Sequence, residues 1–321
     1  MTATGIIRTV LGDIPNEQLG FCHSHEHLFI AEGTPSRLNP VLQIDDFGQT
    51  KDELMVFKSL GGEAIVDAQP IGCGRMADML TEVSKQTGIH IIASTGFHKR
   101  SFYSDNHWLF RGDAERLANT FIAEIEDGMY VHADNQDPRF QITAKAGLIK
   151  TAIEEDSPGS TCINLLNAAA MASLATGIPV MCHTETHRQG MVVAEHLMKR
   201  GVVPKNLIIC HLDRTLGDYS VHQQLAQIGV YLEYDTIGRF KYHSDEEEAD
   251  LIVQMLEWGY GESLLLGLDT TRARLKSYGG EIGLDHMKIN FIPLLRQRGV
   301  SESAIADLMI HNPAHAFKRK K

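Results

Sequence analysis

The chain has 321 residues, of which 43% are hydrophobic and 22% charged, and it carries a formal net charge of −11. This composition predicts a globular protein with a sizeable core and argues against a disordered one. Basic residues are dispersed apart from the terminal KRKK, so the chain lacks the electrostatic footprint of a nucleic-acid-binding protein.

The sequence shows no sign of secretion or of a membrane span. Its first ten residues, MTATGIIRTV, lack a basic start followed by a long apolar run, and a run of about 18 apolar residues occurs nowhere. The five cysteines are odd in number and lie mostly inside apolar runs, which favours buried thiols over a disulfide framework. We therefore expect a cytoplasmic protein without disulfides and without a membrane partner.

Short apolar runs recur along the chain, each continuous in apolarity as buried parallel strands are. These runs are residues 20–27, 63–69, 90–96, 146–150, 178–184, 206–211, 230–235 and 263–269. Stretches with helical periodicity separate them, near 74–86, 114–125, 161–176, 187–200, 216–227, 245–258 and 286–298. This alternation predicts a single (β/α)8 TIM barrel over residues 1–321. The alternative fold is a doubly wound open sheet. It is less favoured because no Gly-rich phosphate fingerprint follows the first strand.

Polar residues able to bind metal stand where several of these strands end. The active site of a barrel lies at the C-terminal ends of its strands, and imidazoles and carboxylates suit zinc or another divalent ion. A lone histidine in an apolar run is more often a hydrogen-bonded core residue, but this coincidence at one structural level favours a metal centre. The candidate ligands are His25, His27, Lys150, His183, His211 and Asp269.

The segment FCHSHEHLFI, residues 21–30, places His23, His25 and His27 at every second position. By strand parity all three share one face, so periodicity allows either 23/25 or 25/27 as a chelating pair. The other candidate ligands stand at strand ends, so depth favours His25 and His27. His23 is predicted to be an inner barrel residue with a hydrogen bond, and Glu26, of opposite parity, to support the outer layer.

Lys150 is an unusual candidate because an ammonium group repels a metal ion. It suits the role if burial favours the neutral amine, which can react with carbon dioxide to give an anionic carbamate that bridges two ions. The alternative is a lysine paired with a neighbouring acid. Lys145, the nearby competitor, has the opposite parity and lies at the start of the run, so geometry favours Lys150.

Together these residues resemble the phosphotriesterase family of the amidohydrolase superfamily. The resemblance is carried by SHEHL (24–28), AGLIK (146–150), ASLATGIPVMCHTE (172–185), CHLD (210–213), LGLD (266–269) and HNPAHAF (311–317), which span most of the chain. It implies a distorted barrel with a binuclear metal centre. Zinc is the expected metal, and manganese or cobalt are the alternatives. It assigns the more buried ion to His25, His27 and Asp269, the more exposed ion to His183 and His211, and the bridge to N6-carboxylated Lys150 and a hydroxide.

The resemblance also implies a mechanism. Two divalent ions about 3.5–4 Å apart bring the pKa of a bridging water close to neutrality and polarise the substrate. Asp269 would be the catalytic residue that accepts the proton. Asp213 and Asp235 are candidates for relaying this proton or for hydrogen-bonding the ligands, with a helix N-cap and a loop cap as their respective alternatives.

The loops after strands seven and eight, residues 235–244 and 269–280, should select the substrate, because the superfamily hydrolyses phosphotriesters, lactones and amides alike. They are rich in cationic and phenolic side chains, which suit a phosphate or carboxylate group, although such residues also balance acidic surfaces. The predicted substrate-binding residues are Lys241, Arg272, Arg274 and Tyr278, with Arg239 and Tyr242 in the same loops and Lys99 and Arg100 as weaker candidates.

The leading hypothesis is a metal-dependent lactonase for a small anionic sugar 1,4-lactone, phosphorylated ones included, as in the sugar-lactone branch of the family. The alternatives are a phosphotriesterase, an amidohydrolase on another ester or amide, and a metal-binding module without turnover. The base Asp269 beside the other ligands weighs against the last. Barrels of this family often dimerise, so a homodimer is one expectation, without a located interface.

Overall fold

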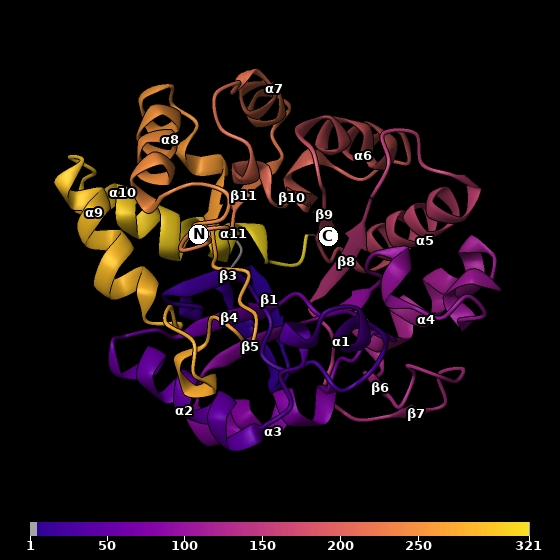
Figure 1. Ribbon diagram of the computed structural model, residues 1–321. Helices are drawn as coiled ribbons and strands as arrows, with labels where there is room; N and C mark the ends of the chain where they lie inside the picture. Colours follow the sequence, from indigo (N-terminus) through magenta and orange to yellow (C-terminus); the bar gives the residue numbers. More distant parts are fainter. Residues whose placement is uncertain (1–4, 321) are drawn as a thin grey trace.

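The computed structural model describes residues 5–320, so the expectations for the first four residues and for Lys321 concern residues outside this range. Eight parallel strands form one sheet in the order β12-β11-β10-β9-β8-β5-β4-β3, surrounded by helices (Figure 1). All the predicted strands and the barrel are confirmed. The strands are β3 (Cys22–Glu26), β4 (Ala64–Asp67), β5 (His90–Gly96), β8 (Leu148–Ala152), β9 (Val180–His183), β10 (Leu207–Ile209), β11 (Tyr231–Tyr234) and β12 (Leu264–Leu266).

The predicted helical stretches are also present. The helices are α1 (Thr34–Leu38), α2 (Phe47–Ser59), α3 (Ala77–Thr87), α4 (Ala114–Glu126), α5 (Ser160–Thr176), α6 (His187–Lys199), α7 (Ser220–Ile228), α8 (Asp245–Glu257), α9 (Ile292–Gln297), α10 (Glu302–Ala306) and α11 (Asn312–Ala316). Sequence periodicity did not predict α2, because its apolar residues 54–57 are adjacent along the chain instead of spaced by three or four.

The core has two layers, one inside the barrel and one between the strands and the helices. The inner layer joins side chains from all the strands, such as Cys22, Ile92 and Leu265, to Ile7 and Phe317. Ile7 belongs to a hairpin of β1 (Ile6–Thr9) and β2 (Gly12–Pro15), and Phe317 follows α11. The hairpin and the C-terminal helix therefore close the N-terminal end of the barrel, which leaves the other end for polar chemistry.

A second hairpin, β6 (Tyr130–Val131) with β7 (Phe140–Gln141), lies between α4 and β8 and was not predicted. The strands β3 and β12 are the two ends of the sheet, and they meet at a seam where the backbone N–H of Asp269 donates to His25 O at 3.0 Å. This contact brings the ends of the first and last barrel strands together.

All five cysteines are free thiols and four of them are buried, as expected. No helix within residues 5–320 combines the length and the apolarity that crossing a bilayer requires.

Candidate metal centre and active site

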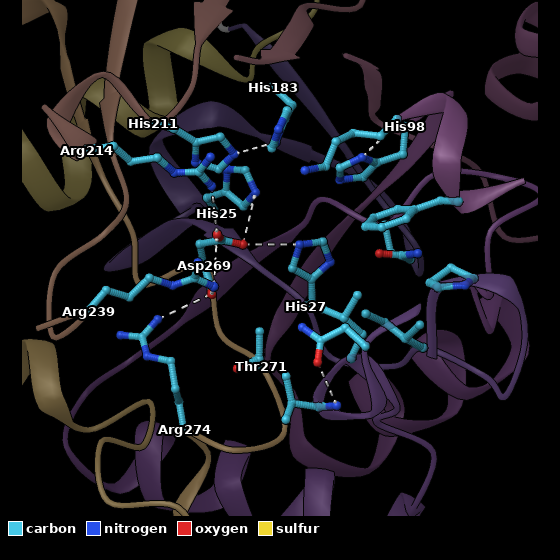
Figure 2. A pocket seen from close by; sticks show the side chains of 18 of the residues that line it. His25, His27, His98, His183, His211, Arg214, Arg239, Asp269, Thr271 and Arg274 are labelled. Carbon is cyan, nitrogen blue, oxygen red and sulfur yellow. Dashed lines mark hydrogen bonds and ion pairs between the residues drawn. The ribbon is translucent and has the colours of Figure 1, made fainter. Parts of the chain in front are cut away.

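A pocket of about 670 Å³ opens at the C-terminal ends of the strands (Figure 2). The loops after β3, β5, β11 and β12 contribute to its wall. The pocket brings together the histidines and the carboxylate that were predicted from their positions at strand ends. Those lining residues are His25, His27, His183, His211 and Asp269.

A bulge in β3 decides which of its histidines reach this pocket. The register of β3 against β4 shifts by one residue between His23 and Glu26. An extra residue reverses the alternation of side chains along a strand. His23 therefore lies outside the barrel, where its ring packs against Phe57 of α2 with centroids 4.7 Å apart. His25, beyond the shift, faces the barrel axis and lines the pocket.

The prediction that His23 shares a face with His25 and His27 is therefore wrong, and His23 is not an inner barrel residue. It does have the expected hydrogen bond, with Nδ1 at 2.9 Å from Glu26 Oε1. Glu26 also accepts hydrogen bonds from two backbone amides near the end of β12. Its carboxylate thus links β3 to the seam of the barrel.

His25, His27 and Asp269 converge at the pocket floor. Asp269 Oδ1 lies 3.3 Å from His27 Nε2 and 3.7 Å from His25 Nε2. Asp269 has a φ of 46°, in the left-handed region, which costs roughly 1–3 kcal/mol for a non-glycine residue. Burial opposes its ionisation, but Arg239 and the histidines hold the pKa of the Asp269 carboxyl well below its usual range. The site therefore contains an ionised carboxylate.

His183 and His211 form a second pair of donors. His183 Nδ1 and His211 Nε2 are 2.7 Å apart, and His211 also adopts the left-handed conformation, with a φ of 62°. Burial lowers the pKa of His183 to about 3 and holds the pKa of His211 well below its usual value. Both rings are therefore neutral near pH 7, the form in which imidazole binds metal ions.

Lys150 lies inside the barrel, fully buried, with Nζ at 3.3 Å from His25 Nε2. The sulfur atoms of Met181 and Cys210 lie 3.6 Å and 3.7 Å from Nζ. Lys145 instead lies beside the N-terminal hairpin, at the opposite end of the barrel. Of the two lysines, Lys150 is the one that the fold places among the candidate ligands.

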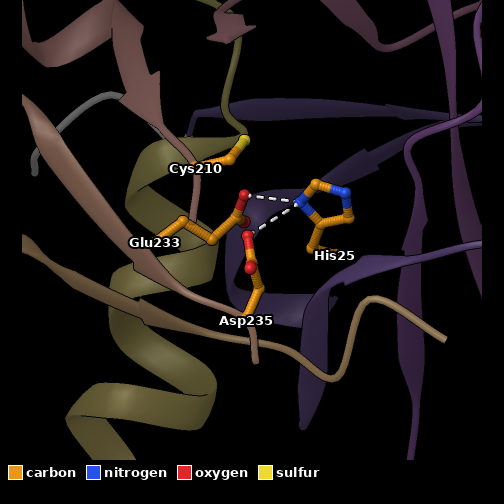
Figure 3. A group of neighbouring side chains, drawn as sticks. All are labelled: His25, Cys210, Glu233 and Asp235. Carbon is orange, nitrogen blue, oxygen red and sulfur yellow. Dashed lines mark hydrogen bonds and ion pairs between the residues drawn. The ribbon is translucent and has the colours of Figure 1, made fainter. Parts of the chain in front are cut away.

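Two buried carboxylates lie behind His25 (Figure 3). Glu233 Oε2 is 2.8 Å and Asp235 Oδ2 is 3.2 Å from His25 Nδ1, and Asp235 Oδ1 is 2.6 Å from His211 Nδ1. Burial and the charge of Lys150 lower the pKa of His25, but the two carboxylates outweigh them and raise it to about 9. These contacts at Nδ1 orient the two rings, so that His25 Nε2 lies toward Lys150 and His211 Nε2 toward His183.

Of the three roles considered for Asp235, hydrogen bonding to candidate ligands is the one that these contacts show. Asp213 has a different environment, because its Oδ2 accepts hydrogen bonds from the Thr236 amide at 2.6 Å and hydroxyl at 2.7 Å. Burial and the nearby Asp235 raise the pKa of Asp213 to about 8. Asp213 thus fastens the loop after β11 and does not cap a helix.

The four predicted substrate-binding residues occupy different places. Lys241 lines the pocket, and its exposed Nζ lies 4.5 Å from the ring centroid of Tyr242. Arg274 also lines it, but its guanidinium is engaged by backbone carbonyls, including Ile237 O at 2.6 Å and Asp269 O at 3.3 Å. Arg274 therefore joins the loops after β11 and β12.

Arg272 and Tyr278 are not among the described residues that line the pocket, so the structure does not bring them together with the other candidate residues there. The exposed guanidinium of Arg272 lies 5.3 Å from the Tyr278 ring centroid. The hydroxyl of Tyr278 is 2.8 Å from Thr50 Oγ1 on α2. Tyr278 thus fastens the loop after β12 to α2, and Arg272 contacts the ring of Tyr278 within the same loop.

Four further charged residues lie at the pocket, and two of them, Glu185 and Arg214, were not predicted as site residues. Arg239 Nη2 lies 3.0 Å and Arg214 Nη2 3.7 Å from Asp269 Oδ2. Glu185 connects Lys99 Nζ, at 2.6 Å, with Arg214 Nη1, at 3.1 Å. These contacts place three cations around the histidines, each partly balanced by a carboxylate. Only Lys99 and Arg239 carried a sequence signal, as basic residues in loops after strands.

Comparison with known proteins agrees with this geometry. The model of the phosphotriesterase family matches residues 5–317. The chain belongs to the phosphotriesterase family. The resemblance seen in the sequence motifs is thereby confirmed over nearly the whole chain.

One similar protein and two similar solved structures are covered over at least 92% of their length. The phospho-furanose lactonase of Mycoplasmopsis synoviae (strain 53) is 33% identical over 334 residues, which covers 98% of this chain and 92% of that protein. The structure of an amidohydrolase from Mycoplasma synoviae has a TM-score of 0.94 at 30% identity and covers 99% of this chain and 93% of that one. The structure of a lactonase from Listeria monocytogenes has a TM-score of 0.90 at 26% identity, with 98% and 100% covered. This member of the phosphotriesterase family is therefore a hydrolytic enzyme, and the alternative of a metal-binding module without turnover is wrong.

Proposed function

We propose that the protein is a metal-dependent lactonase that opens small anionic sugar 1,4-lactones, with phosphorylated lactones as its preferred substrates. The observation that carries the proposal is the presence of cationic side chains in the same pocket as the histidines and Asp269. Lys99, Arg214, Arg239 and Lys241 line this pocket, and the similarity to a phospho-furanose lactonase supports the same substrate class. A pocket of about 670 Å³ suits a small molecule.

The donor set fits two divalent ions. His25, His27 and Asp269 would hold one ion, and the neutral rings of His183 and His211 the other, while Lys150, next to His25, would join them as a carbamate. Zinc is the first candidate, and manganese or cobalt also suits nitrogen and oxygen donors. Bound ions supply Lewis acidity and lower the pKa of water at the site.

The chain's own residues supply the proton transfer and the orientation. The ionised Asp269 carboxylate would accept the proton of the attacking water and deliver it to the ring oxygen as the acyl C–O bond breaks. Arg239 and Arg214 hold Oδ2 of this carboxylate and favour its charged form. Lys241 at the rim would contact the anionic group of the substrate. A phosphotriesterase or an amidohydrolase would use the same acid–base group, so a substrate panel distinguishes these alternatives.

We expect purified, metal-loaded protein to hydrolyse phosphorylated 1,4-lactones faster than their unphosphorylated counterparts, and faster than aryl phosphotriesters or N-acyl amides. Lys241→Ala should reduce the preference for the phosphorylated lactone by about 10–100-fold, since a hydrogen bond to a charged group is worth roughly 1.5–3 kcal/mol. The measurement is the ratio of kcat/KM for each pair of lactones.

Arg272→Ala is the matched control, because this cation lies in the neighbouring loop but outside the pocket. It should leave the ratio unchanged. An equal ratio for wild type and Lys241→Ala would show that Lys241 does not read the phosphate. Lack of lactone hydrolysis by protein containing two equivalents of metal would overturn the proposed function itself.

A further inference from the structure

The carboxylate of Glu26 spans the seam between the first and last barrel strands. Glu26 is fully buried, its Oε1 accepts a hydrogen bond from the Leu268 amide at 3.0 Å, and its Oε2 accepts one from the Thr270 amide at 3.1 Å. These two amides flank Asp269 on either side. One carboxylate therefore holds the backbone both before and after the proposed catalytic base.

The seam is tight enough for this contact to control the position of Asp269. The Asp269 amide donates to His25 O at 3.0 Å. A Cβ atom on Gly267 would lie 2.9 Å from the same His25 carbonyl oxygen, so only glycine fits there without a shift. Two groups of β3 thus hold Asp269: the His25 carbonyl accepts from its own amide, and the Glu26 carboxylate accepts from the amides on either side of it.

This confinement gives a reason for the left-handed conformation of Asp269. An aspartate rarely adopts a φ of 46°, and such a conformation persists only where surrounding contacts impose it. Hydrogen bonds from backbone amides to a carboxylate, such as the two that Glu26 accepts, are stronger than those between neutral groups. In this conformation Asp269 Oδ1 faces the Nε2 atoms of His25 and His27.

We infer that Glu26 is a positioning residue that holds Asp269 in its left-handed conformation and so builds the ion site of His25, His27 and Asp269. The inference rests on the proposed metal centre. The β3 bulge is part of the same device, because the shift in register falls between His23 and Glu26 and ends at the residue that reaches the seam. Glu26 acts through Asp269 and does not line the pocket.

Glu26→Gln tests the inference with little change of volume. An amide side chain offers one acceptor oxygen and an NH₂ donor, so one of the two backbone amides would face a donor instead of an acceptor. We expect this variant to bind its ion about 10–100-fold more weakly, the range for losing a residue that supports a ligand. Affinity is measured by transfer of cobalt from the loaded protein to a chelator. The visible absorption spectrum of the cobalt protein should also change, because it reports the geometry of the ligands.

Glu53→Gln is a matched control. Glu53 is likewise buried, and its carboxylate accepts hydrogen bonds from the amides of Ser277, at 2.9 Å, and Leu284, at 2.8 Å, away from the pocket. It should lower the melting temperature as Glu26→Gln does, yet leave cobalt affinity and the cobalt spectrum unchanged. Equal cobalt affinity of Glu26→Gln and wild type, or equal weakening by Glu53→Gln, would overturn the inference.

A third variant keeps the test possible if Glu26→Gln fails to fold. Glu26→Asp keeps two acceptor oxygens on a shorter side chain, and it should show a smaller loss of cobalt affinity than Glu26→Gln, with the same contrast to Glu53→Gln. Wild-type protein that binds cobalt but opens no lactone would refute the proposed function only. The affinity comparison would still decide the role of Glu26.

Discussion

The substitution Asp269→Asn is expected to reduce lactone hydrolysis by about 10²–10⁴-fold, the usual contribution of a general acid–base group. The amide keeps the shape of the side chain but accepts no proton at neutral pH. It also leaves Arg239 and Arg214 without the charge that they contact at Oδ2. Steady-state kinetics on the best lactone substrate, with metal content measured on the same sample, gives the result.

Asp285→Asn is the control for that experiment. Asp285 is a largely buried carboxylate paired with Lys276 at 2.7 Å, outside the pocket. It should affect stability and leave kcat within the range of wild type. If Asp269→Asn retains metal and turns over at the wild-type rate, Asp269 is not the base, and another group must accept the proton.

The candidate ligands were predictable because their positions follow from local pattern and strand direction alone. His183 lies near the end of the apolar run 178–184 and Asp269 ends the run 263–269, and parallel strands bring such ends to one edge. The pocket contains these residues together with His25, His27 and His211. No knowledge of side-chain packing is needed for that conclusion, so sequence reasoning succeeds here.

Other features of the site depend on contacts between distant parts of the chain, which local sequence patterns do not show. Tyr278 forms a hydrogen bond with Thr50 on α2. The sequence did not predict this helix because the periodicity of its apolar residues is weak. Glu233 is a single acid in an apolar strand, and its role becomes visible only when β11 lies beside His25. An acid inside an apolar strand is itself a signal, because a buried charge is costly unless a partner stabilises it, and this cost predicts a partner for Glu233.

The bulge in β3 is the most consequential of these features, because strict alternation assigned His23 to the wrong face. One inserted residue exchanges the inner and outer sides of a strand, and no local propensity in residues 21–30 marks the insertion. The two histidines that depth along the strand favoured, His25 and His27, nevertheless both line the pocket. The structure also gives a different reason why His23 is not a candidate ligand: its side chain lies outside the barrel, not deeper inside it.

The substitutions His27→Ala and His23→Ala are therefore expected to have opposite signatures. His27→Ala removes an imidazole 3.3 Å from Asp269 Oδ1, so it should lose one equivalent of metal and at least about 100-fold in activity, more than loss of a supporting residue costs.

His23→Ala removes a ring packed between β3 and Phe57, and it should lower the free energy of unfolding by roughly 2–4 kcal/mol, as other large-to-small core substitutions do. It should retain both metal equivalents, because Glu26 keeps its two amide hydrogen bonds at the seam without His23. Metal analysis and denaturant titration of both variants separate the two effects. Loss of metal from folded His23→Ala would show that the outer face of β3 controls the centre more directly than the hydrogen bonds of Glu26 do.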